Sequence, residues 1–235
     1  RASVVVSADT KEKAFAVARP LAVKFWETRK DYKLTVENGN LENGVKAALS
    51  AAENRFFLSD SGDNTTAGAA GDRLDVAAEF LRFPSEKSVC IAGITSAETV
   101  AACKNIPTGQ SYSLNIGGKD YDAVVTAHGK ILGWAKEIIG DSVTLRVRNV
   151  DLIFTEKRSA FISAENFDCA GADLKSYRVV AVKLGYLFDE LLPYCNRHYF
   201  ALSDGGSCVD MKRHSYKKIC RPVFPLDENA EFGRK

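Results

Sequence analysis

Two carboxylates lie close together in a glycine-rich loop that follows a short apolar run. The run from Arg55 to Ser59 leads into Asp60, and Asp63 follows three positions later in a loop that extends to Asp72. Paired carboxylates of this kind could bind a metal ion or exchange protons with a substrate. The same residue types are common in turns and helix caps, so a purely structural role stays open. The loop does not match the phosphate-binding pattern Gly-x-x-x-x-Gly-Lys-Ser/Thr.

Other polar and basic side chains could complete a site around these carboxylates. Lys183 closes the apolar run 179–182, and Arg158 follows the run 151–155. A lysine at a strand end could neutralise an acidic ligand or pair with one of the two aspartates. For both basic residues, a side chain that simply points to solvent is the alternative. The candidate binding residues are Asp60, Asp63, Asn64, Thr66, Arg158 and Lys183, and no residue is assigned as catalytic.

The sequence offers no local set of metal ligands. Its three histidines are His128, His198 and His214, and they form neither His-Glu-x-x-His nor His-x-His. Cys208 and Cys220 flank His214, but their spacing fits no standard zinc pattern. There is also no Gly-x-Ser-x-Gly nucleophile motif and no dinucleotide-binding fingerprint after a strand. The sequence by itself therefore predicts that this chain holds no metal.

The elements that would position these residues alternate between strands and helices. Strands are expected over 55–60, 88–94, 178–183 and 199–203, and helices over 41–53, 74–81, 96–104 and 186–192. This alternation is typical of an α/β fold with a mainly parallel sheet flanked by helices. Ligands of such sheets bind beyond the carboxyl ends of the strands, where the 61–72 loop and Lys183 would lie.

The segment around 109–156 follows a different pattern. Residues 111–116 and 121–126 read as a hairpin with a turn at Gly117 and Gly118, and 143–147 and 151–155 read as a second pair of strands. No helical periodicity fits between Gly109 and Glu156. We therefore expect an antiparallel β insert in the α/β fold.

The two ends of the chain are expected to be less regular. Residues 2–7 read as a buried strand, and 10–30 as a helix capped by Thr10 that Pro20 should kink or divide. Residues 217–235 are expected to form an extended wrap with a loose end. Because a strand so close to the terminus needs partners, we expect the chain to continue a longer protein.

Charge and composition exclude several classes of function. The chain has 235 residues, with 32 Lys and Arg against 30 Asp and Glu, for a net charge of +2. A dedicated nucleic-acid binder would need a larger basic excess, and the basic run 212–221 reads better as a solvated face than as a phosphate patch. No apolar run approaches the ~20 residues that span a bilayer, so no membrane partner is expected.

The cysteine pattern indicates a reducing compartment. The six cysteines include no Cys-x-x-Cys pair, and several lie in apolar surroundings, as Cys90 does between Val89 and Ile91. Disulfide frameworks belong mainly to small secreted domains, which this chain is not. Nothing at the start resembles a signal peptide. Free thiols in a cytoplasmic protein are expected.

Four ordered blocks resemble a known family, the MlrC-like metallopeptidases. Their typical loop is Asp-x-x-Asp-Asn-Pro-x-x-Gly-x-x-Gly-Asp after a strand, which the segment 58–72 follows except that Thr65 stands in place of the proline. The blocks 155–158, 177–183 and 216–227 resemble the C-terminal domain of the same family. Residues 1–54 resemble the end of that family's preceding N-terminal domain and its connection, and 55–235 its C-terminal α/β domain.

The resemblance implies a zinc-dependent hydrolase that acts on peptide or related amide bonds. The family's zinc ligands lie in its N-terminal domain, and this chain has no histidine before His128 onto which they could be carried. The resemblance therefore implies an Asp-rich loop that lines a cleft, with a small peptide-like substrate as partner. Zinc would be supplied by an N-terminal metal-binding domain that is missing here or belongs to another chain. The alternative is a non-catalytic module that binds a small anionic ligand at the 62–72 loop.

Overall fold

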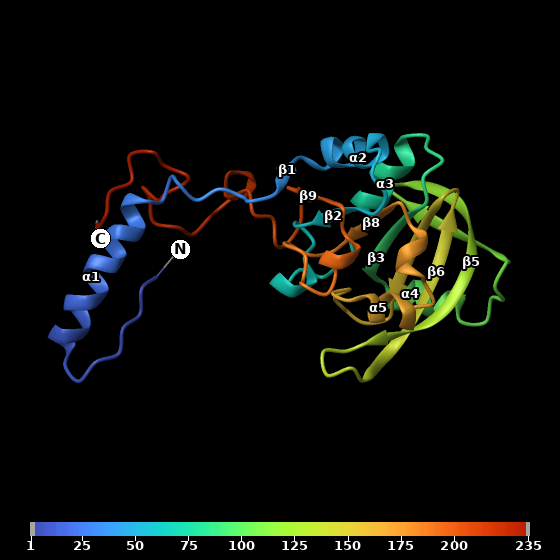
Figure 1. The fold of residues 1–235 in the computed structure, drawn as a ribbon, viewed down its shortest axis with the longest axis horizontal. Coiled ribbons are helices and arrows are strands. Elements are labelled where there is room, and N and C mark those ends of the chain that lie inside the picture. The colour runs from blue at the N-terminus through green and yellow to red at the C-terminus, as the bar shows by residue number, and fades with distance from the viewer. Residues whose placement is uncertain (1–2, 234–235) are drawn as a thin grey trace. The chain divides into compact units, whose positions relative to one another are not determined.

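A computed structural model describes residues 3–233 of the chain. Contacts divide the chain into two compact units, residues 1–35 with 210–235, and residues 36–209 (Figure 1). The predicted domain boundary at residue 54 is not tested by this division and stays a prediction.

The unit of residues 36–209 is built on one nine-stranded sheet in the order β1-β9-β2-β8-β3-β7-β6-β5-β4. Its strands are β1 (Glu37–Gly39), β2 (Phe56–Asp60), β3 (Val89–Thr95), β4 (Ser111–Ile116), β5 (Lys119–Leu132), β6 (Ile138–Val147), β7 (Val150–Thr155), β8 (Val179–Val182) and β9 (Arg197–Ala201).

The sheet is parallel from β1 to β7 and antiparallel beyond it. Strands β1, β9, β2, β8, β3 and β7 all pair parallel with their neighbours. Strands β6, β5 and β4 then follow as antiparallel neighbours. The predicted α/β fold with an antiparallel insert is confirmed, and the insert extends the central sheet.

Helices cover both faces of the sheet (Figure 1). Helices α2 (Leu41–Ser50), α3 (Asp75–Arg82) and α4 (Ala97–Cys103) bury apolar side chains in one core with β2 and β3. Helix α5 (Ala164–Cys169) and the segments around it form a second core on the opposite face, centred on Phe57, Phe161 and Phe167. Burying one such ring contributes roughly 1.5–3 kcal/mol. Cys90 and Cys103 are buried free thiols, one in each core.

The parallel strands bring distant segments to one edge of the sheet. Strands β2, β3, β7, β8 and β9 all end at this carboxyl edge, and the loops that follow them meet there. The hairpin between β5 and β6 reaches the same edge, because β6 runs antiparallel to β7 with Ser142 opposite Thr155. Any site made from these loops therefore combines residues that are far apart in the sequence.

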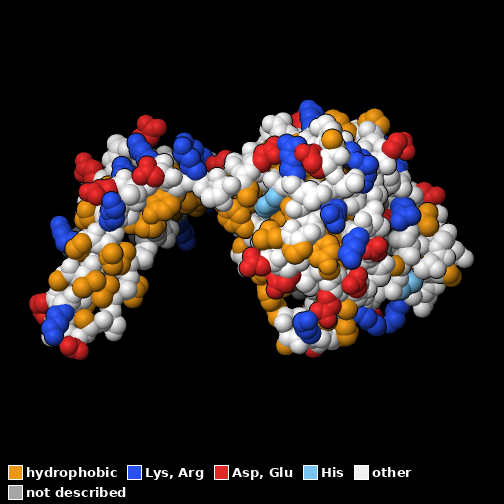
Figure 2. All heavy atoms as spheres, in the orientation of Figure 1, with side chains coloured by type: hydrophobic (Ala, Val, Ile, Leu, Met, Phe, Trp, Pro, Cys, Tyr) orange, Lys and Arg blue, Asp and Glu red, His pale blue; other side chains and the backbone are white. Residues whose placement is uncertain are grey.

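The other unit contains α1 (Lys11–Glu27) and an irregular C-terminal segment. Thr10 caps the helix as predicted, with its hydroxyl accepting from Lys13 N at 3.3 Å. Trp26 packs against Arg29, Phe224 and Phe232. No residue of α1 is buried, and Phe15 is 62% exposed. Hydrophobic side chains lie at the surface of this unit (Figure 2). Among the described residues, no helix has the length and apolarity needed to cross a membrane.

Two local predictions are wrong, and a third is wrong in part. Of the strand expected over 2–7, residue 2 lies outside the described residues; residues 3–7 form no strand, and Val5 is 91% exposed, because the described part of their unit offers no strand to pair with. Pro20 does not divide α1, which continues past it, although proline removes one backbone bond; a kink at Pro20 stays a prediction. The helix expected over 186–192 is replaced by tight turns that lead into a short 3-10 helix at Leu192–Tyr194, since Pro193 has no N–H to donate to a longer helix.

The imidazole of His198 links the stability of the sheet to pH. His198 lies in β9 with Nε2 2.7 Å from the Ser59 hydroxyl, and burial lowers its pKa to about 4. The unfolded chain, with a pKa near 6.5, binds more protons than the native state as pH falls from about 6.5 to 4. This contribution to stability is therefore complete above about pH 6.5 and is lost as pH falls through that window.

We expect the wild-type free energy of unfolding to fall by on the order of 2 kcal/mol more than that of His198→Gln between pH 7 and 4, with allowance for the partly exposed ring. Urea titrations at pH 7, 6, 5 and 4 measure this difference. His128→Gln, which changes a surface histidine, is the control. Parallel pH profiles for wild type and His198→Gln would contradict the prediction.

Candidate functional site

A buried ion network joins two strands at the carboxyl edge. Lys183, directly after β8, donates from Nζ to Asp63 Oδ2 at 2.7 Å and to Asp60 Oδ2 at 3.2 Å. Its third bond goes to the carbonyl of Arg73 at 2.8 Å. All three charged side chains are no more than 4% exposed. The lysine thus pairs with both aspartates, and its three donors are all used within the fold.

Each carboxylate of the network also accepts from the surrounding loops. Asp63 accepts from the backbone N–H of Gly71 at 2.8 Å and of Arg73 at 2.9 Å. Asp60 accepts from the hydroxyl of Ser203 at 2.5 Å. Buried charges need such partners, because removing an ion from water carries a penalty of several kcal/mol. The loop is therefore wrapped around Asp63 and attached to the segment after β9.

The small residues of the loop allow protein segments to approach one another. A Cβ at Gly62 would lie 2.3 Å from the carbonyl oxygen of Ser203, so no side chain fits there. Gly71 has φ +79°, a left-handed conformation that favours glycine, and a Cβ there would lie 2.6 Å from Cγ2 of Thr65. These glycines serve packing against neighbouring loops.

Asn64 and Thr66 form a local turn at the surface of the network. The side-chain oxygen of Asn64 accepts from Thr66 N at 2.9 Å and from the Thr66 hydroxyl at 2.7 Å. The backbone N–H groups of residues 62, 64, 65, 67, 69, 71 and 73 likewise donate to oxygens within the fold. An anion at this loop would have to displace such bonds, so the loop is a poor anion cradle.

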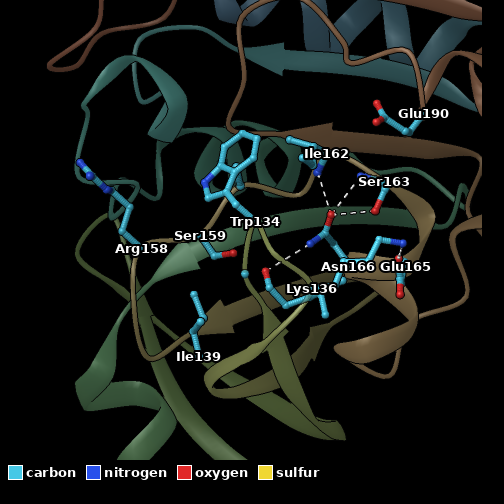
Figure 3. A pocket seen from close by; sticks show the side chains of 13 residues that line it. Trp134, Lys136, Ile139, Arg158, Ser159, Ile162, Ser163, Glu165, Asn166 and Glu190 are labelled. Atoms are coloured by element: carbon cyan, nitrogen blue, oxygen red, sulfur yellow. Dashed lines mark hydrogen bonds and ion pairs between the residues drawn. The ribbon is translucent and has the colours of Figure 1, made fainter.

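Arg158 lies apart from the network and lines a cavity of about 210 Å³ (Figure 3). Its guanidinium reaches back to the carbonyl of Ala69 at 3.5 Å, a long contact with the 61–73 loop. The cavity is formed by the β5–β6 hairpin, the loop after β7 and the start of α5. We name it the Trp134 cavity; its lining includes Leu132, Gly133, Trp134, Lys136, Ile139, Arg158, Ser159, Ala160, Ile162, Ser163, Glu165, Asn166 and Glu190.

The residues do not fit a metal site. Within residues 3–233, no three His, Cys, Asp or Glu side chains gather in a way that could hold a metal ion. The nearest approach to a carboxylate pair, Asp60 with Asp63, already has an ammonium between its oxygens. A divalent cation placed there would be repelled by Lys183.

The structure adds residues that sequence patterns did not single out. Ser203 and Ser207 complete the hydrogen bonds of the loop, with Ser207 accepting from Asn64 N at 2.9 Å. A signal existed, because the segment 202–207 is a second polar, glycine-containing turn directly after a strand. No sequence pattern marked Trp134 or Glu190, since one is a single aromatic residue and the other a single acidic residue, each in an ordinary loop. Use of the six predicted residues in substrate binding stays a prediction.

Comparisons with a family model, a curated protein and a solved structure all find proteins of one kind. Residues 58–218 match the protein family described as "MlrC C-terminus". Microcystinase C from Sphingomonas sp. is 28% identical over 198 residues, which cover 78% of this chain and 38% of that protein. The fold resembles a crystal structure described as a "putative metallopeptidase" from Mesorhizobium sp. BNC1, with a TM-score of 0.73 and 16% identity. That match covers 91% of this chain and 46% of the other. The chain spans less than half the length of both relatives.

Replacing Lys183 by Met should destabilise the chain by about 3–5 kcal/mol, because two buried carboxylates then lose their shared cation. The matched control is Lys130→Met, which removes an exposed pair with Asp141 and should change stability by about 0–1 kcal/mol. Urea unfolding followed by far-UV circular dichroism measures both free energies. Equal effects of the two substitutions would show that the network is not the main constraint on the loop.

Proposed function

This chain belongs to the MlrC C-terminal family, as its sequence blocks predicted, and we propose that it is the C-terminal part of a zinc-dependent, metallopeptidase-like hydrolase. The observation that carries the proposal is the family match over 58–218, which includes the Asp63 loop and Lys183. The name of the related Microcystinase C supports peptide or related amide bonds as the substrate class.

The geometry supports a division of roles at the carboxyl edge. Asp60, Asp63 and Lys183 are buried and saturated, so they act as positioning residues that fix the 61–73 loop. Asn64, Thr66 and Arg158 lie at or near the surface of the same edge and remain the candidates for substrate contact. A preorganised loop at a strand's carboxyl end favours binding because less ordering is needed when the ligand arrives.

Zinc ligands for this activity would come from outside the described residues, because those residues do not fit a metal. We propose an N-terminal metal-binding domain as their source. Both relatives are long enough to contain such a domain in addition to the matched region. The substrate would then lie between that domain and the carboxyl edge. The alternative, a non-catalytic anion-binding module, is not favoured by the geometry, since most of the loop's backbone N–H groups donate to oxygens within the fold.

The complete gene product should hydrolyse members of a mixture of short synthetic peptides, and the 235-residue chain alone should not. Incubation with 1,10-phenanthroline should abolish the activity and added zinc should restore it. Mass spectrometry of the peptides and elemental analysis of both proteins provide the measurements. Stoichiometric zinc on the 235-residue chain alone, or hydrolysis that resists chelation, would overturn the proposal.

In the complete gene product, Asp63→Asn should lower turnover by about tenfold or more. The amide cannot accept in the same way from both backbone N–H groups and Lys183, so the loop loses its fixed position. The control is Asp122→Asn, an exposed residue of β5 that should leave turnover unchanged. Unchanged kinetics in Asp63→Asn would remove this loop from the active cleft.

A further inference from the structure

We propose that the Trp134 cavity binds a zwitterionic ligand of dipeptide size, with the ligand's carboxylate at Arg158 and its ammonium at Glu190. This inference rests on the proposed function, because it names the class of peptide that the carboxyl edge receives. Trp134, the charges that line the cavity and the size of the cavity support this assignment.

Trp134 is a large aromatic side chain held in an exposed position. The indole is 69% exposed, and its ring contact is with Phe188, at a centroid distance of 6.0 Å. The hairpin that carries it is closed by a bond from Gly133 N to the Glu137 carbonyl at 2.8 Å. An aromatic ring presented in this way offers contact area with little loss of side-chain freedom, which is typical of binding hot spots.

The tip of the hairpin is tied to the body of the unit. Lys136 adopts a left-handed conformation, with φ +62°, and its Nζ lies 2.7 Å from Glu165 Oε2 on α5. Asn166 supports the floor below, where its side-chain oxygen accepts from the backbone of Ile162 at 3.1 Å and Ser163 at 3.0 Å. The cavity is therefore formed before a ligand arrives.

Two opposite charges remain available in the lining. Lys136 and Glu165 neutralise each other, whereas neither Arg158 nor Glu190 has an ion-pair partner anywhere in the described chain. Figure 3 shows Trp134 between Arg158 on one side and Glu190 on the other. The charges of the lining balance, so the cavity suits a ligand that carries both a carboxylate and an ammonium better than a simple anion.

The size of the cavity limits the ligand. Its volume of about 210 Å³ is below the roughly 300–1,000 Å³ of pockets that enclose drug-sized molecules. One or two amino-acid residues fit this space, with an apolar side chain on the indole.

Fluorescence of Trp134 can test the inference on the 235-residue chain. The chain has two tryptophans, so in Trp26→Phe the emission comes from Trp134 alone. The probes are leucyl-phenylalanine, its N-acetyl derivative and its C-terminal amide. We expect a saturable change with the free dipeptide, and affinity at least tenfold weaker for each blocked form.

Charge-removing variants assign the two ends of the ligand. In the Trp26→Phe background, Arg158→Met should abolish the preference for the free carboxylate, and Glu190→Gln the preference for the free amine. Lys157→Met, an exposed neighbour outside the lining, should keep both preferences. Absence of a saturable change, or equal affinities for the three probes, would overturn the inference. Dipeptide binding by a complete gene product that hydrolyses no peptide would overturn the proposed function alone.

Discussion

The buried ion network of Lys183, Asp60 and Asp63 is the constraint on which the carboxyl edge depends. Each of these charges carries a desolvation penalty of several kcal/mol, which only a complete set of partners offsets. The partners come from β2, the 61–73 loop, the end of β8 and the segment after β9. The network is stable only when all of these partners are present. It therefore fixes the four segments relative to one another cooperatively.

This constraint separates rigid positioning from contact with a ligand. Two carboxylates and an amine are the side chains at this edge best suited to acid–base chemistry or ligand binding. They use their hydrogen bonds inside the protein. In the proposed function, recognition falls to side chains at the rim, where Arg158, Trp134 and Glu190 keep polar or aromatic surface available. A site built in this way gains precision from the buried network and specificity from its rim.

Patterns in the sequence predicted the parts of the fold that local physics determines. Strand–helix alternation and the Gly117-Gly118 turn predicted the sheet with its insert, and the strand ends predicted where Asp63 and Lys183 would lie. The sequence could not decide whether Lys183 pairs with an aspartate or points to solvent, because Lys183 and Asp63 are about 120 residues apart in the chain. The valine run at residues 4–6 misled for a related reason, since β propensity produces a strand only where a neighbouring strand exists.

The same network explains how an aspartate-rich loop can belong to a metallopeptidase-like family without offering a metal site of its own. Two carboxylates with a cation between them resemble half of a metal centre, but here the cation is the ammonium of Lys183. An ammonium makes three directed hydrogen bonds and leaves no ligand position open to water or substrate, unlike a catalytic metal. The loop is thereby stabilised with no dependence on metal supply. If the proposed hydrolase uses zinc, the zinc can be bound or lost elsewhere while this edge of the sheet keeps its shape.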